Sequence, residues 1–149
     1  MIKNNYCLRE VEYMDLDKGI LKLISQLSTI GVTYDKAKWE FDAYCEELNK
    51  NKNQKHFVIE VDNTIIASGT LLIEYKIIHD FKNVGHIEDI VVHRNYRKKG
   101  YSRILIEKLI DVAKNSHCYK VILNCNPNCE NFYNKFGLDR KYIQMAKYF

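Results

Sequence analysis

The spacing of hydrophobic residues along the chain changes between a helix-like and a strand-like period, and this predicts a protein that mixes helices with strands. Residues at helical spacing predict amphipathic helices over Asp15–Leu27, Tyr34–Asn49 and Ser102–Ser116. Two apolar runs on either side of Asp62-Asn63 predict a β-hairpin. The expected strands are Tyr6–Val11, His56–Val61, Thr64–Glu74, Gly85–Val92, Lys120–Cys125 and Arg140–Phe149, with a short helix over Glu130–Gly137. The order βααβββαβαβ indicates an α/β (α+β) fold with a mixed central sheet flanked by helices.

Length and composition predict one domain over residues 1–149. The chain is 46% hydrophobic, has a single proline, and contains no stretch rich in Gly and Ser that would read as a linker. Its apolar runs are too short to span a bilayer, and its first ten residues lack the apolar region of a secretory signal, so we expect a cytoplasmic protein that does not enter the membrane. The net charge of +4 suits an anionic substrate and does not by itself indicate nucleic acid.

The five cysteines point to reduced thiols rather than to disulfides or a metal site. Their number is odd and their spacing irregular. Cys125 and Cys129 are separated by three residues, but no second ligand pair or nearby histidine accompanies them. We therefore expect no bound metal.

A basic turn, Arg97–Ser102, lies between the end of a predicted strand and the start of a predicted helix. Free N–H groups and the positive end of the helix dipole make such a helix start an anion site, and Gly100 allows a close backbone approach. Taken alone, the same residues also fit a solvated basic turn or a nucleic-acid patch.

Two further features carry candidate chemistry. Glu88 and Asp89 are adjacent acids in an otherwise apolar strand, where neighbours point to opposite faces, so one of them should face the interior or a cleft. An edge strand that shows both acids to water is the alternative. Tyr133 follows the turn at Pro127 and could be either a catalytic hydroxyl or a packed aromatic.

Taken together and in this order, these features resemble the GNAT superfamily of N-acetyltransferases. Arg97–Ser102 fits the coenzyme A signature Arg/Gln-x-x-Gly-x-Gly/Ala except at its last position, where Ser102 stands. GHIEDI, CYKVIL and FYNKFG, together with LSTIG (Leu27–Gly31), resemble the glucosamine 6-phosphate N-acetyltransferase family across nearly the whole chain.

The resemblance implies acetyl-CoA as co-substrate, with Glu88, Asp89 and Tyr133 as catalytic residues. Its implied coenzyme-binding residues are Ile90, Val91, Val92, Arg97, Lys98, Lys99, Gly100, Tyr101, Ser102, Arg103, Asn128, Phe132 and Tyr133. The implied residues for the phosphorylated amino sugar are Ser28, Lys76, His79, Glu88, Asp89, Asn124, Lys147 and Tyr148. The resemblance also implies a homodimer in which the C-terminal strand reaches the partner's active site.

Three positions depart from the family pattern. Asn124 stands where the family has Asp, Cys129 replaces an Asn and has Asn128 beside it, and Tyr148 replaces an Arg with Lys147 one residue earlier. Lys76 and His79 would converge on one phosphate only if the chain bends after Glu74, and we expect that it does.

The simplest mechanism is direct attack of a neutral amine on the thioester. A strand N–H near Ile90 would hold the oxyanion, and Tyr133 would donate a hydrogen bond or proton to the departing thiolate. An acyl-cysteine intermediate at Cys125 or Cys129 is an alternative scheme. Two other functions stay open at this point, namely an acetyltransferase for another amine and a basic nucleic-acid-binding module built on Arg94–Arg103.

Overall fold

The computed structural model describes residues 5–31 and 33–149 and is built around a five-stranded sheet. The strands lie in the order β1-β2-β3-β4-β5, antiparallel throughout except for the parallel pair β4 and β5. Their bounds are β1 Cys7–Glu10, β2 Gln54–Val61, β3 Thr64–Glu74, β4 Asn83–Val92 and β5 Cys118–Ile122. The helices are α1 Ile20–Ile24, α2 Tyr34–Lys50, α3 Ile78–Phe81, α4 Tyr101–Asn115 and α5 Glu130–Tyr133, with 3-10 turns η1 Tyr13–Asp15, η2 Arg94–Tyr96, η3 Pro127–Cys129 and η4 Asn134–Phe136. The α/β class and the mixed, helix-flanked sheet are therefore confirmed.

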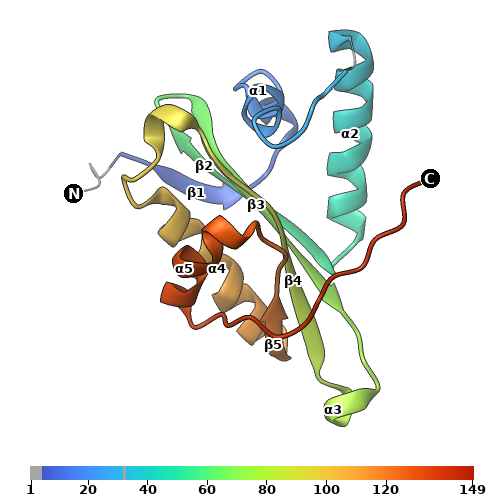
Figure 1. Ribbon diagram of the computed structural model, residues 1–149. Helices are drawn as coiled ribbons and strands as arrows, with labels where there is room; N and C mark the ends of the chain where they lie inside the picture. Colours follow the sequence, from blue (N-terminus) through green and yellow to red (C-terminus); the bar gives the residue numbers. More distant parts are fainter. Residues whose placement is uncertain (1–4, 32) are drawn as a thin grey trace.

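Helices cover the two faces of the sheet in separate layers. Figure 1 shows α1 and α2 on one side and α4 and α5 on the other. On the α4 side, Leu105 and Leu109 are fully buried against Leu71 and Ile87 of the sheet. On the α1 and α2 side, Ile20 and Phe41 pack against strand residues of a second apolar cluster. The sheet thus has an apolar core on each face, as expected for helices on both sides of a sheet.

The β2–β3 hairpin forms as predicted because its turn has suitable residues. Asp62 and Asn63 both have positive φ, 46° and 59°. Asp and Asn tolerate this left-handed conformation, and two such residues in succession match the twist of a two-residue hairpin. Val61 and Thr64 pair directly across the turn.

The predicted helix over Asp15–Leu27 is wrong in its extent. The segment forms the 3-10 turn η1 and then, after Gly19, the short helix α1. Gly19 has φ 87°, which no right-handed helix contains, so it interrupts the predicted periodicity. Ile20 and Leu23 are still buried, as their spacing indicated.

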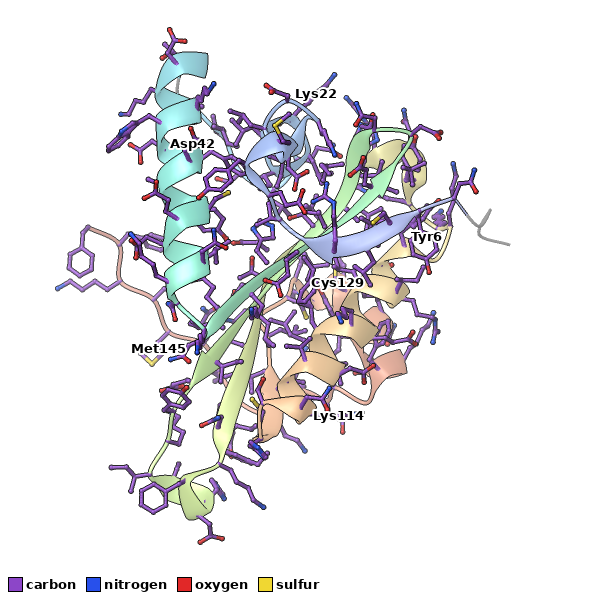
Figure 2. The ribbon with its side chains drawn as sticks, turned by 180° about the vertical axis from the view of Figure 1, so that it is seen from behind. Tyr6, Lys22, Asp42, Lys114, Cys129 and Met145 are labelled. Atoms are coloured by element: carbon purple, nitrogen blue, oxygen red, sulfur yellow. The ribbon has the colours of Figure 1, made fainter. Side chains whose placement is uncertain are left out.

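The predicted last strand over Arg140–Phe149 is also wrong in the described chain. Residues 138–149 belong to neither a helix nor a strand, and side chains such as Tyr148 are 92% exposed. A strand requires a hydrogen-bonding neighbour, and β5 does not pair with this segment. Figure 2 labels Met145 on this free segment, which Figure 1 draws as an extended red coil ending at the C-terminus.

Across residues 5–31 and 33–149, none of the helices has both the length and the apolar character needed to cross a membrane.

Candidate functional site

The two adjacent acids lie at a β-bulge in the middle of the sheet. Glu88 is opposite Thr70 and Val91 is opposite Ser68, so Asp89 and Ile90 together face the single residue Gly69. Asp89 is the extra residue and has φ 54°. β4 lies between β3 and β5 in the sheet order, but its pairing with β5 ends at His86, so it has a free edge beside the two acids. The alternative in which both acids face water does not hold, because Glu88 is half-buried.

The bulge also changes which way these side chains point. Strict alternation would place Glu88 and Asp89 on opposite faces. With the extra residue, Glu88 lies half-buried and Asp89 lies exposed. Ile90 points to the α4 face, where its Cδ1 atom lies in front of Gly69.

Beside the bulge, β4 and β5 separate and leave a cavity. Their pairing ends at His86 and Ile122, whereas β4 continues to Val92, so this edge of β4 extends past the end of β5. A cavity of about 260 Å³ lies next to this edge. It is lined by Ile90, Val92, Tyr96, Arg97, Lys98, Tyr101, Ser102, Cys129, Phe132 and Tyr133.

The basic turn forms one wall of this cavity and leads directly into α4. Gly100 caps the helix with φ 92°, and Lys98 also has positive φ, 61°. The first N–H groups of a helix have no acceptor within it. In α4 the Arg103 N–H donates to the Gly100 carbonyl at 3.0 Å, so the N–H groups of Tyr101 and Ser102 are those left for an anion. Arg97 and Lys98 are exposed, and Arg97 is held by an Nε–H donated to the Val92 carbonyl at 3.0 Å. The turn can therefore bind an anionic group at the cavity mouth.

Tyr133 supplies the hydroxyl that lines the opposite wall. It ends α5, is half-buried, and packs edge-on against Phe132 with ring centroids 5.0 Å apart. Burial raises its pKa, and the neighbouring thiols Cys129 and Cys125 raise it further. The hydroxyl therefore stays protonated at neutral pH and can act as a donor.

The chain bends after Glu74, as predicted. His79, Asp80 and Phe81 all have positive φ, between 55° and 60°. The His79 ring stacks on Tyr119 of β5 at 4.1 Å between centroids. This bend removes the extended geometry that would have kept Lys76 and His79 apart.

Lys76 belongs to a short chain of charges on the sheet. Its Nζ pairs with one oxygen of Glu74, and the other oxygen accepts from His86 Nε2 at 2.9 Å. The pKa of Glu74 is lowered by the hydrogen bond from Lys76 and by that from His86. Glu74 therefore stays ionised and holds the ammonium group close to the sheet.

The remaining residues predicted for the site lie elsewhere on the molecule or at the edge of the cavity. Lys99 lies over the Tyr96 ring at 4.9 Å, and Arg103 pairs with Glu107 at 3.3 Å. Val91 is buried on the α1 and α2 side, away from the cavity. Ser28, Asn124, Asn128, Lys147 and Tyr148 are all exposed, and the last two lie on the free C-terminal segment.

Sequence reasoning missed one cavity residue, Tyr96, and named Cys129 only as a departure from the family pattern and as an alternative acyl-cysteine nucleophile. Tyr96 lies within η2, between the strand and the basic turn, and its ring packs at 6.1 Å from that of Tyr101. Its position next to the signature was the available signal. Cys129 ends η3, immediately before α5. Among the described residues, no cluster of His, Cys, Asp or Glu has a geometry that could hold a metal ion.

Comparison with known proteins agrees with this geometry. The Acetyltransferase (GNAT) family matches residues 22–138. A glucosamine 6-phosphate N-acetyltransferase of Arabidopsis thaliana is 37% identical over 146 residues, covering 95% of both chains, and one of Candida albicans is 30% identical over 148 residues, covering 98% of this chain and 97% of its own. The crystal structure of the Arabidopsis enzyme superimposes with a TM-score of 0.90, covering 98% of this chain and 99% of the other. This protein therefore belongs to the GNAT family of acetyltransferases.

Proposed function

We propose that this protein transfers the acetyl group of acetyl-CoA to the 2-amine of glucosamine 6-phosphate, which gives N-acetylglucosamine 6-phosphate and coenzyme A. The observation that carries the proposal is the match, over 95% of both chains, to an Arabidopsis enzyme of that name. It favours this activity over acetylation of an unrelated amine and over a nucleic-acid-binding module.

The cavity beside β4 suits the coenzyme. Acetyl-CoA supplies an activated acetyl group and a thiolate leaving group. The available N–H groups of α4, with Arg97 and Lys98, suit the charge of a pyrophosphate. The extended edge of β4 offers backbone groups to the amides of the pantetheine arm. Val91 would contact the coenzyme through its backbone only, since its side chain faces away from the cavity. The other residues proposed to contact the coenzyme are Ile90, Val92, Arg97, Lys98, Lys99, Gly100, Tyr101, Ser102, Arg103, Asn128, Phe132 and Tyr133.

The catalytic groups act on protons and on developing charge. A backbone N–H at Ile90, next to the bulge, holds the oxyanion that forms as the amine attacks. Tyr133 donates to the departing sulfur, which its raised pKa permits. Glu88 and Asp89 orient the amine and the sugar hydroxyls. A sugar amine is less basic than a lysine side chain, so no strong general base is required.

The substrate phosphate is assigned to the bend after Glu74. Lys76 supplies a point charge and His79 a ring N–H donor. The carboxylate of Glu74 already binds Lys76, so phosphate binding would share this ammonium group. Asn124, two residues after β5, and Ser28, after α1, are the residues that we assign to the sugar itself.

The C-terminal segment supports a homodimer. Its apolar side chains, including Tyr142 and Ile143, are at least 90% exposed, and the segment belongs to no strand of the described chain. A second copy would provide a strand for this segment to pair with, and would bring Lys147 and Tyr148 to a neighbouring substrate site. We further propose that residues 1–149 form one domain. The cytoplasmic location expected from the sequence stays a prediction.

The phosphate assignment is tested with Lys76→Ala. The variant should raise KM for glucosamine 6-phosphate about tenfold to a hundredfold, the value of one charged hydrogen bond, and leave KM for acetyl-CoA unchanged. Lys82→Ala, an exposed lysine of the same bend, is the matched control and should behave as wild type. Equal KM values for Lys76→Ala and wild type would remove Lys76 from the phosphate site.

A further inference from the structure

A chain of hydrogen bonds connects α2 to the buried interior of the sheet. The Tyr44 hydroxyl lies 2.9 Å from His56 Nδ1, and His56 Nε2 lies 2.6 Å from Ser68 Oγ. His56 is 5% exposed and Ser68 is 1% exposed, so both are core positions. The Tyr44 and His56 rings also meet edge-on, with centroids 5.7 Å apart. These three side chains, which we term the Tyr44 network, come from α2, β2 and β3.

The imidazole in the centre of the Tyr44 network is neutral. Burial lowers the pKa of His56 to about 4. A neutral imidazole has one N–H donor and one bare nitrogen, so Tyr44 and Ser68 cannot both accept from it. One hydroxyl must donate to the ring and the other must accept. Whether the Tyr44 hydroxyl donates to the ring or accepts from it therefore depends on the hydrogen bond between Ser68 and the other side of the ring.

The outer end of the Tyr44 network lies beside the acidic bulge. Thr70 and Gln54 interact with the Tyr44 hydroxyl, and Thr70 is the residue directly opposite Glu88 in the sheet. Burial raises the pKa of Tyr44, and the negative charge of Asp89 raises it further. A carboxylate on this side favours the arrangement in which Ser68 donates to His56, His56 donates to Tyr44, and Tyr44 donates outward.

Apolar contacts also hold α2 in place, and the Tyr44 ring packs against the same apolar cluster. Phe41 and Cys45 of the same helix are already buried in the apolar cluster with Val58 and Val91. Burying a polar group costs free energy unless the group is hydrogen-bonded. Apolar residues of similar volume could fill these positions without needing hydrogen-bond partners. Two buried polar residues and a half-buried tyrosine that end next to two acids therefore indicate a role for the hydroxyl.

We propose that Tyr44 is a positioning residue for acetyl transfer, and that His56 and Ser68 direct its hydroxyl towards the Glu88–Asp89 bulge. This role rests on the function proposed above. The hydroxyl fixes the carboxylates that orient the amine, and it does not itself take part in bond making. Its loss should therefore change turnover of the sugar and leave coenzyme binding intact.

The test compares Tyr44→Phe, Ser68→Ala and their double variant. Tyr44→Phe keeps the ring and removes one hydrogen-bonding group, so kcat for glucosamine 6-phosphate should fall about tenfold with KM for acetyl-CoA unchanged. Ser68→Ala should lower kcat in the same direction, because Tyr44 loses its orientation. The double variant should be no slower than Tyr44→Phe alone, since both changes break one chain. Tyr13→Phe, an exposed tyrosine of η1, is the matched control and should turn over as wild type.

The outcomes separate this role from the proposed function. Unchanged kcat in Tyr44→Phe, with wild type acetylating the sugar normally, would show that the network only packs α2 and would overturn the proposal. Full additivity of the two single changes in log kcat would also overturn it, because the residues would then act independently. A wild type that releases no thiol with glucosamine 6-phosphate would overturn the proposed function itself, and this role with it.

Discussion

Gly69 faces the bulge of β4, and alanine at this position would place a methyl group where there is no space for it. An ideal Cβ would lie 2.5 Å from Ile90 Cδ1, 3.1 Å from Leu105 Cδ2 and 3.3 Å from Leu109 Cδ1. The atom at 2.5 Å is the end of a rotatable side chain, so Ile90 must move. Because Ile90 lines the cavity, Gly69→Ala should alter the coenzyme site as well as the core.

Gly85→Ala is a matched control on the same face of the sheet. Its Cβ would lie 3.1 Å from Ala113 Cβ, from Leu71 Cδ1 and from Val121 Cγ1, so it is also overpacked, but at a distance from the bulge. Neither glycine has positive φ, so alanine brings no backbone strain at either site. The two variants therefore differ mainly in which side chain must move.

The stability cost should be similar for both variants. Overpacking by one methyl group destabilises the fold by about 1–3 kcal/mol, whereas replacing a strand glycine by alanine stabilises it by about 0.5–1 kcal/mol. The net loss is about 0–2.5 kcal/mol, which corresponds to at most about 10 °C in Tm for a chain of this size.

The two variants should differ in how well they bind acetyl-CoA. We expect KM for acetyl-CoA to rise about fivefold in Gly69→Ala, equivalent to about 1 kcal/mol, and to stay at the wild-type value in Gly85→Ala. Steady-state thiol release gives KM, and thermal melting with and without acetyl-CoA gives binding independently of turnover. Equal KM values and equal protection in both variants would refute the placement of the coenzyme against Ile90.

Three other perturbations address the turn, the acid and the buried histidine. Gly100→Asp adds a carboxylate and a side chain at φ 92°, so acetyl-CoA should protect this variant far less than wild type in thermal melts; equal protection would move the pyrophosphate elsewhere. Tyr133→Phe should lower kcat by at least about 10²-fold with unchanged coenzyme binding, and an unchanged single-turnover rate would exclude it as the acid. His56 binds a proton with a pKa of about 4 when folded and about 6.5 when unfolded, so the unfolded state takes up protons first as pH falls. Its contribution should lower the free energy of unfolding by about 2 kcal/mol between pH 7.5 and 5 in urea titrations, and His56→Gln should lack this loss. An identical pH dependence in the two proteins would contradict the buried, neutral histidine.

The sequence predicted correctly those elements that depend mainly on residues close together in the chain. The hairpin follows from Asp62-Asn63, and α4 follows from its apolar stripe after Gly100. The bulge at Asp89 depends instead on what β3 places opposite β4, namely Gly69, and the β4 sequence alone does not contain that register. The last predicted strand is absent for the same reason. A segment forms a strand only if another strand lies beside it to pair with, and the sequence of the segment does not contain that information.

The candidate site, like the fold, was only partly predictable from the sequence. Residue type alone left the basic turn and Tyr133 open, the family resemblance assigned both to the site, and both line the cavity. The Tyr44 network was missed because its members come from three elements and meet only across the β2–β3 register. His56 at the start of an apolar run and Ser68 within another were the available signals, since polar residues in buried strands require partners.

The most direct test of the account is thiol release by the wild-type protein with acetyl-CoA, with either glucosamine 6-phosphate or glucosamine as acceptor, and the product identified by mass spectrometry. The account predicts an N-acetylated sugar phosphate, and a kcat/KM about tenfold to a hundredfold higher for the phosphorylated acceptor, the value of one charged hydrogen bond to phosphate. Equal efficiency with both sugars, or no release with either, would contradict it.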